Sequence, residues 1–254
     1  MTILEAVVLG ILQGLTEFLP VSSSGHLVIA QKLLGFSEPP IIFDVLLHIG
    51  SLMAVLVFFN KQFLKIKLKI IWLIIIGTFP AVLVGLFLNK YIDFIFNSWS
   101  MVGYSFIITA VFLFSTVLIK QANKKNLTTI NWLDSLIIGF MQAVAILPGI
   151  SRSGSTVVAG LWRKLSRETA FMYSFYLAVP AILGASVLKI KDVLEGGNNY
   201  LSLNIIIIGL LTSGLSSLLA IFLLKKVILK GKLNYFGVYC LILGLTILFF
   251  KNFF

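Results

Sequence analysis

The sequence predicts an all-α polytopic membrane protein. Of its 254 residues, 59% are hydrophobic and only 11% are charged, and the mean hydropathy is +1.06. These values lie far outside the range of a soluble globular domain. Several apolar stretches of about twenty residues are long enough to cross a hydrocarbon core as helices. The apolar runs are continuous rather than alternating, which argues against membrane-spanning strands.

Six apolar runs are expected to span the membrane, near residues 41–60, 70–88, 100–119, 171–188, 203–224 and 235–250. The net charge of +11 does not indicate nucleic-acid binding, because the basic residues gather at the ends of apolar runs. Topology signals and anionic lipid headgroups account for basic residues in those places. We also expect Met1 onward to be mature protein, since a basic region and a small-residue cleavage site are both missing there.

The chain contains an internal duplication at an offset of 129 residues. Eight positions pair with identical residues, so that Leu4, Gly10, Gln13, Ser22, Ser24, Gly25, Val28 and Ala30 match Leu133, Gly139, Gln142, Ser151, Ser153, Gly154, Val157 and Ala159. The repeats cover about 1–120 and 131–254 within one integral membrane domain, 1–254. Each repeat starts with a serine-bearing segment and continues with three apolar runs.

Each serine-bearing segment is expected to form a re-entrant helical hairpin. In the first, residues 3–18 and 24–35 can be helical, but Pro20 and Gly25 interrupt them, and each arm is too short to span alone. The alternative is one broken span, and the distribution of Lys and Arg separates the two. Hairpins place fourteen basic residues on one side and five on the other, whereas full crossings would divide them ten to nine. The positive-inside rule therefore favours hairpins, with both termini outside.

The larger basic group comprises Lys61, Lys65, Lys67, Lys69, Lys120, Lys124, Lys125, Arg163, Lys164, Arg167, Lys225, Lys226, Lys230 and Lys232, and the smaller comprises Lys32, Lys90, Lys189, Lys191 and Lys251. Three crossings per repeat invert the second repeat relative to the first. The fold class is therefore an inverted-topology repeat of six transmembrane helices and two re-entrant hairpins, whose tips can meet in a polar cavity inside the membrane.

Two polar motifs supply the candidate site, at residues 13–26 (QGLTEFLPVSSSGH) and 148–156 (PGISRSGST). Gln13 and Glu17 are four residues apart and share one helical face. A carboxylate at membrane depth needs a partner or a proton, so Glu17 stands out as functional. The plainer alternative is that Glu17 pairs with Arg152 only to hold the repeats together, but an apolar pair would do that as well.

The two serine turns favour an anionic ligand. A serine cluster followed by glycine suits a tight turn that opens a helix, where backbone N–H groups and hydroxyls receive an anion. The first turn provides Ser22, Ser23, Ser24 and Gly25, and the second provides Ser151, Ser153, Gly154 and Thr156. The second turn adds Arg152, whose planar guanidinium fits phosphate. Together the turns predict a phosphate-bearing substrate.

His26 follows the first turn and is placed for proton transfer or nucleophilic attack, although a lone histidine is more often structural. Asp44 and His48 form a second pair four residues apart near the outer end of the first span, where they either assist the site or cap the helix. A divalent cation, Mg²⁺ with Ca²⁺ as the alternative, would bind through Glu17 and the substrate phosphates.

These motifs resemble the two signatures of the undecaprenyl-diphosphate phosphatase family, the bacitracin-resistance type. The first signature is Glu or Gln, three residues, then Glu, which matches Gln13 and Glu17. The second, Pro-Gly-x-Ser-Arg-Ser, begins here at Pro148. The similarity covers almost the whole chain, including residues 165–168, Ser174-Phe175 and Pro180-Ala181. Because Gln13 stands where other members have glutamate, Glu17 is left as the main candidate carboxylate.

The resemblance implies hydrolysis of undecaprenyl diphosphate to undecaprenyl phosphate and inorganic phosphate at the outer face of the bacterial plasma membrane. This reaction recycles the lipid carrier of cell-wall synthesis and confers bacitracin resistance. Undecaprenyl diphosphate and bilayer lipid are the expected partners, nucleic acid is not, and a homodimer is left open. Carried over by position, the essential residues are Glu17, Ser23, His26 and Arg152, with Ser22, Ser151 and Thr156 as neighbours.

The residues leave the nucleophile open between His26, Ser23 and water. They also leave a rival function, a transporter or flippase of undecaprenyl phosphate or another anion, because inverted repeats with broken helices are typical of carriers. Glu17 and His26 correspond to Ile146 and Ser155 in the second repeat. This asymmetry favours chemistry over transport.

Overall fold

The computed structural model describes residues 1–36, 40–88, 98–119, 125–196 and 202–250, together with Tyr91 and Ile95. Regular structure in these residues is helical apart from one isolated bridge between Lys125 and Leu165. Some of the basic residues counted above lie outside the described residues, namely Lys90, Lys120, Lys124, Lys251 and the side chain of Lys191.

The helices are, in chain order, α1 (Ile3–Phe18), α2 (Ser23–Leu33), α3 (Ile41–Phe58), α4 (Asn60–Phe63), α5 (Leu68–Leu88), α7 (Trp99–Ser115) with the 3₁₀ turn η2 (Thr116–Leu118), α8 (Trp132–Val144), α9 (Arg152–Trp162), α10 (Arg167–Gly196), α11 (Leu203–Leu229) and α12 (Asn234–Phe250). Each predicted apolar run contains one helix. The ends differ most at α10 and α11, which continue beyond the apolar windows because lysine is a good helix former outside the hydrocarbon region.

Five helices in the described part of the chain are long and apolar enough to cross a membrane: α3, α5, α7 with η2, α10 and α11. The chain is therefore a multi-pass helical membrane protein. The sixth predicted span corresponds to α12, which has 17 residues and lies just under the length of about 20 that a spanning helix usually needs.

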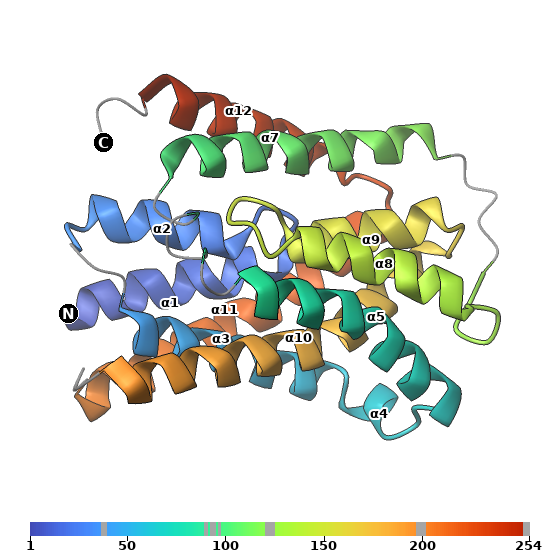
Figure 1. The fold of residues 1–254 in the computed structure, drawn as a ribbon, viewed down its shortest axis with the longest axis horizontal. Coiled ribbons are helices and arrows are strands. Elements are labelled where there is room, and N and C mark those ends of the chain that lie inside the picture. The colour runs from blue at the N-terminus through green and yellow to red at the C-terminus, as the bar shows by residue number, and fades with distance from the viewer. Residues whose placement is uncertain are drawn as a thin grey trace.

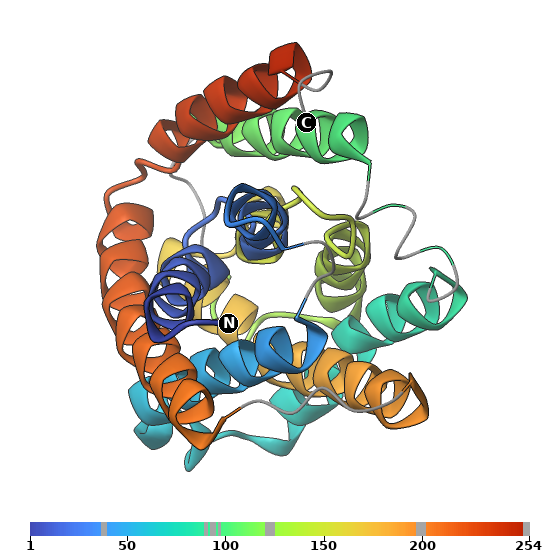
Figure 2. The same ribbon diagram turned by 90° about the vertical axis from the view of Figure 1, so that its left-hand side faces the viewer.

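The long helices surround a central group of four shorter ones, of which α1 and α8 each keep an exposed apolar face. Figure 1 shows α3, α7, α10, α11 and α12 running along the longest axis, with the start of α1 and the finish of α12 at the same end. Viewed along that axis, these helices and α5 form a ring around α1, α2, α8 and α9 (Figure 2). The four central helices carry both serine turns, so the ring shields the polar motifs from its surroundings.

Close glycine contacts set the positions of α1 and α8 inside the ring. A Cβ added at Gly139 of α8 would lie 2.3 Å from the carbonyl oxygen of Gly77 in α5. A Cβ at Gly14 of α1 would lie 2.3 Å from the carbonyl oxygen of Ser213 in α11. Small residues allow helix backbones to approach this closely in membrane proteins. The first arm of each serine-bearing segment is thus packed on a long helix of the other half.

A buried ionic cluster holds the start of α8 and the end of α9 together. The carboxylate of Asp134, which has no exposed surface, accepts hydrogen bonds from Lys125 Nζ at 2.8 Å and from Arg163 Nε at 2.9 Å. Asp134 also closes a capping box with Asn131 at the start of α8. Because Arg163 follows α9 directly, this cluster ties the beginning of α8 to the end of α9.

Replacing Gly139 by alanine is expected to lower stability by about 1–3 kcal/mol, because the new methyl group overpacks against the α5 backbone. The change would appear as a lower Tm of the purified protein in detergent. Gly184→Ala is the matched control, since no atom lies within 4 Å of a Cβ at Gly184. Equal melting temperatures for the two variants would contradict the close packing of α5 on α8.

Candidate active site

The two serine turns meet at the centre of the bundle. Ser22 Oγ accepts hydrogen bonds from Gly149 N at 3.1 Å and from Gly25 N at 3.4 Å, so it joins the second turn to the first. A Cβ at Gly25 would lie 3.0 Å from the Cα of Gly149 and 2.7 Å from the Phe106 ring. Glycine at position 25 therefore permits the close approach that the sequence motif predicts.

Thr109 of α7 fixes the second turn from outside. Its hydroxyl donates to the carbonyl oxygen of Gly149 at 2.8 Å and accepts from Ser151 N at 3.1 Å. No sequence signal marks this residue, because a threonine in an apolar helix more often bonds to its own backbone. Only the packing of α7 on α9 reveals its contact.

Most serines of the turns serve the turns themselves. Ser22 caps α2, and Ser151 caps α9 by accepting from Gly154 N at 3.1 Å. Each cap pairs with the serine two residues later, at 3.3 Å for Ser24 and 3.2 Å for Ser153. Ser153 is also 3.2 Å from the carbonyl oxygen of Leu19, to which it can donate. These serines therefore shape the N-termini of α2 and α9.

Glu17 is the centre of the polar cluster. Its Oε1 accepts from Arg152 Nη2 at 2.7 Å, and its Oε2 accepts from Ser23 Oγ at 2.6 Å and from Gln13 Nε2 at 3.0 Å. His48 Nε2 lies 3.7 Å from the same Oε2. The Glu17 side chain is only 6% exposed, so these partners replace the water that a carboxylate otherwise requires. The partner expected for this carboxylate is present.

Arg152 belongs to the second turn, and its side chain extends to Glu17 in the cluster. Its side chain is 15% exposed, and the guanidinium carbon is 5.8 Å from the centre of the Phe18 ring. A guanidinium has five N–H donors, so the bond to Glu17 leaves donors for the oxygens of a phosphate group. Without a ligand, Arg152 is thus paired with Glu17, and it still has donors with which to bind an anion.

His26 is buried beside the first turn and has partners at both ring nitrogens. Nδ1 lies 2.7 Å from the carbonyl oxygen of Ser22, which can only accept, so Nδ1 carries the proton. Nε2 lies 2.6 Å from the hydroxyl of Tyr239, whose ring stacks on the imidazole. Tyr239 was missed in the sequence because it lies in the last apolar run, 213 residues from His26.

The remaining candidates divide between the cluster and its surroundings. His48 joins the cluster through Glu17, whereas the Asp44 carboxylate accepts from Gln31 Nε2 at 2.7 Å. Thr156 is buried and bonds to Ser174 of α10 at 2.6 Å, so it connects α9 to the ring of long helices. His48 thus lies next to the Glu17 carboxylate, and Thr156 supports α9, the helix that carries Arg152.

The donor set fits a hard cation such as Mg²⁺. Among the described residues, no three His, Cys, Asp or Glu side chains gather as a ready metal cage. However, Gln13 Oε1 is a buried oxygen without a hydrogen-bond partner, and the amide that carries it already bonds to Glu17. Mg²⁺ binds oxygen ligands, commonly one or two from the protein together with phosphate and water. Gln13 and Glu17 provide two such oxygens on one helical face.

The fold and the cluster define a class: a multi-pass helical membrane protein with a buried polar cluster of carboxylate, guanidinium and imidazole groups at its centre. The sequence profile of the family described as "Bacitracin resistance protein BacA" matches residues 6–246. The chain belongs to this family.

Relatives named undecaprenyl-diphosphatase are similar over nearly their whole length. The protein from Carboxydothermus hydrogenoformans is 42% identical over 251 residues, which cover 96% of this chain and 95% of the relative. The protein from Alkaliphilus metalliredigens is 39% identical over 278 residues, with 99% of both chains covered. The protein from Halothermothrix orenii is 40% identical over 260 residues, with 100% of both chains covered.

Proposed function

We propose that this protein hydrolyses undecaprenyl diphosphate to undecaprenyl phosphate and inorganic phosphate, and so supports bacitracin resistance. The observation that carries the proposal is the contact of Arg152 with Glu17 at 2.7 Å between two serine turns. This contact brings a guanidinium suited to phosphate binding next to a buried carboxylate and the Ser23 hydroxyl. The relatives' shared name, undecaprenyl-diphosphatase, supports the same reaction.

We propose further that six spans and two re-entrant hairpins form an inverted repeat in the bacterial plasma membrane. Two features support this: α2 and α9 begin and end 129 residues apart, and α1 and α8 begin at opposite ends of the bundle (Figure 1). The site then opens to the outer face, with both termini outside, because most Lys and Arg residues belong to the opposite side. The prenyl chain stays in lipid between the spans.

The reaction uses His26 as the nucleophile. The Ser22 carbonyl holds the proton on Nδ1, which leaves a lone pair on Nε2, and substrate binding displaces the Tyr239 hydroxyl from it. Nε2 attacks the terminal phosphorus, the bond to the bridging oxygen breaks, and undecaprenyl phosphate leaves with that oxygen. Water then attacks the phosphorus and releases inorganic phosphate. Arg152 stabilises the negative charge on the transferring phosphoryl group.

When bound, Mg²⁺ neutralises charge on the diphosphate and polarises its phosphorus–oxygen bonds. Glu17 and Gln13 Oε1 would hold it together with phosphate oxygens. The Ser23 hydroxyl also donates a 2.6 Å hydrogen bond to the Glu17 carboxylate, which makes Ser23 the alternative nucleophile, since a hydroxyl paired with a carboxylate base can be activated.

The reaction is tested by measuring phosphate release from undecaprenyl diphosphate by the purified protein in detergent, with and without Mg²⁺. We expect release that depends on the cation. No release by well-folded protein with several prenyl diphosphates and cations would favour the transporter or flippase, which vesicle flux assays would then address. The asymmetry between Glu17 and its counterpart Ile146 is the observation against the transporter.

Rapid quenching during turnover is expected to trap a phosphoenzyme that is stable in base and labile in acid, as phosphohistidine is. His26→Gln would abolish both the trapped species and turnover, whereas Tyr239→Phe would retain both, because phenylalanine leaves Nε2 free. A phosphoenzyme stable in acid and lost in Ser23→Ala would assign the nucleophile to Ser23. Product formation without any trapped covalent species would show that water is the nucleophile.

A further inference from the structure

We propose that a second site, at the basic end of the bundle, binds the phosphate of an anionic phospholipid. A cavity of about 340 Å³ lies there between the ends of η2, α9 and α11 and the start of α10. Leu161 of its wall is nine residues after Arg152 on α9, which corresponds to about 13 Å along the helix axis. The cavity is therefore separate from the candidate active site.

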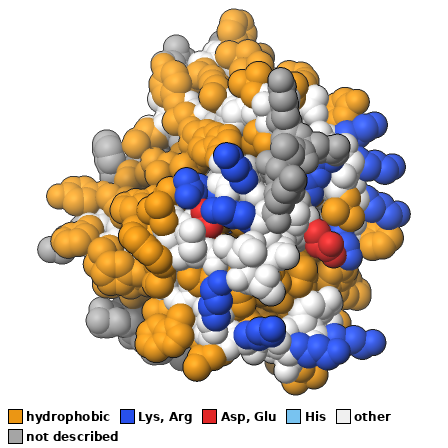
Figure 3. All heavy atoms as spheres, turned by 90° about the vertical axis from the view of Figure 1, so that its right-hand side faces the viewer, with side chains coloured by type: hydrophobic (Ala, Val, Ile, Leu, Met, Phe, Trp, Pro, Cys, Tyr) orange, Lys and Arg blue, Asp and Glu red, His pale blue; other side chains and the backbone are white. Residues whose placement is uncertain are grey.

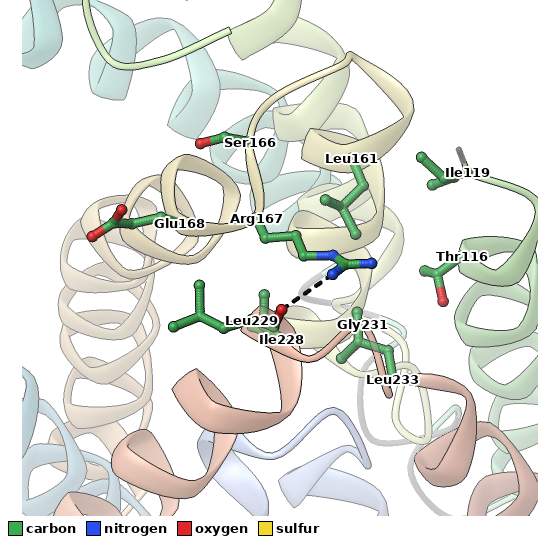
Figure 4. Close-up of a pocket in the computed structure, with 10 residues that line it drawn as sticks. All are labelled: Thr116, Ile119, Leu161, Ser166, Arg167, Glu168, Ile228, Leu229, Gly231 and Leu233. Carbon is green, nitrogen blue, oxygen red and sulfur yellow. Dashed lines mark hydrogen bonds between the residues drawn. The ribbon is translucent and has the colours of Figure 1, made fainter. Parts of the chain in front are cut away.

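Arg167 supplies the charge inside this cavity. Figure 4 shows its guanidinium directed into the space, where Nη1 donates to the carbonyl oxygen of Leu229 at 3.1 Å. Among the described residues, no carboxylate lies within 4.0 Å of it, and the neighbouring Glu168 points away (Figure 4). A half-buried guanidinium with one such bond retains donors for a phosphate group.

Gly231 keeps the space around this guanidinium open. It has a φ of 68°, and a Cβ at this position would lie 2.2 Å from Arg167 Nη2. Any larger residue would therefore push the guanidinium or fill its surroundings. The turn after α11 thus combines a backbone conformation that favours glycine with access to the arginine.

The walls of the cavity combine polar and apolar residues: Thr116, Ser166 and Glu168 line it together with Ile119, Leu161, Ile228, Leu229 and Leu233. Free phosphate gains nothing from the apolar part of these walls, whereas the glycerol backbone and upper acyl chain of a lipid bury apolar surface against it. A ligand with both an anionic phosphate and an apolar arm fits the site better than an inorganic anion does.

The charge of the surrounding surface agrees with an anionic lipid. Figure 3 looks onto this end of the bundle, where Lys and Arg side chains gather and acidic ones are fewer. Lys164, Lys230 and Lys232 are exposed and close in sequence to the cavity residues. Basic pockets between membrane helices are typical binding sites of anionic headgroups.

Lipid titration by native mass spectrometry of the purified protein tests the proposal, with phosphatidylglycerol against phosphatidylcholine. Wild type should retain phosphatidylglycerol preferentially, and Arg167→Gln should weaken its binding about tenfold. Gly231→Asn should do the same while keeping every charge, since asparagine tolerates a positive φ but fills the space. Lys226→Gln is the charge-matched control, because this lysine lies over the Phe222 ring outside the cavity.

Two further arms make each result decisive. Inorganic phosphate should not displace the lipid, and displacement at equal concentration would identify a free-anion site instead. If Lys226→Gln and Arg167→Gln weakened phosphatidylglycerol binding equally, the lipid would be held by diffuse surface charge and not by the cavity. Should the variants misfold, hydrogen exchange of wild type decides: phosphatidylglycerol should protect residues 161–168 and 228–233 more than phosphatidylcholine does, and equal protection would overturn the site.

Discussion

Replacing Arg152 by alanine is expected to slow phosphate release by about 10³-fold or more, the effect of removing an arginine that stabilises a transferring phosphoryl group. Arg152→Lys should recover only part of this loss, because an ammonium group cannot bind a phosphate through two parallel hydrogen bonds. The measurement is steady-state phosphate release in detergent with saturating Mg²⁺ and substrate.

The control for Arg152 concerns folding. Loss of the guanidinium leaves the Glu17 carboxylate buried without its cation, which destabilises a protein by about 3–5 kcal/mol. The double variant Arg152→Gln with Glu17→Gln removes both charges and should restore much of the thermal stability without restoring turnover. Lys65→Ala removes an exposed charge far from both serine motifs in the sequence and should leave turnover unchanged. Near-normal hydrolysis by Arg152→Ala would exclude this residue from the site.

Replacing Glu17 by glutamine is expected to reduce turnover by a comparable factor of about 10³ and to remove the response to Mg²⁺. Glutamine keeps the size and part of the hydrogen bonding of glutamate, but it has no charge to hold a cation or to orient Ser23. Phosphate release is measured over a Mg²⁺ titration in wild type and variant. The two curves should differ in slope as well as in height.

Glu5→Gln is the matched control for Glu17. Glu5 lies on the same helix and closes a capping box with Thr2, a position in which glutamine also serves. The variant should therefore keep both the turnover and the Mg²⁺ dependence of wild type. Should Glu17→Gln retain its Mg²⁺ response, the cation would bind through other groups, and the role of Glu17 would be limited to positioning Arg152 and Ser23.

Hydropathy and helix-breaking residues predicted the helices well, since each predicted apolar run corresponds to one α-helix. Residues 3–18 match α1 in full, and the second arm was placed one residue late and two residues too long. The capping serine explains the first difference, because Ser22 stands outside the helix and Ser23 begins it. The physical signals here are local, so the sequence alone carries them.

The sequence showed which residue types form the cluster, but it predicted only some of the contacts among them. The expected contact between Glu17 and Arg152 is present, and His48, which the sequence left between two roles, faces the same carboxylate. Its neighbour Asp44 bonds to Gln31 instead. Helical spacing places such residues on one face, yet the rotation of α3 against α1 decides which of them reaches Glu17.

The sequence by itself determined the membrane class, the helices, the duplicated serine turns and the residue types of the site, because hydropathy, helix capping and charge depend on near neighbours. The tertiary structure alone decided the contacts of His26 with Tyr239 and of Thr109 with Gly149, which join helices distant along the chain. It also created the cavity beside Arg167 from the ends of four elements. Such contacts depend on how helices pack, and no local pattern records that packing.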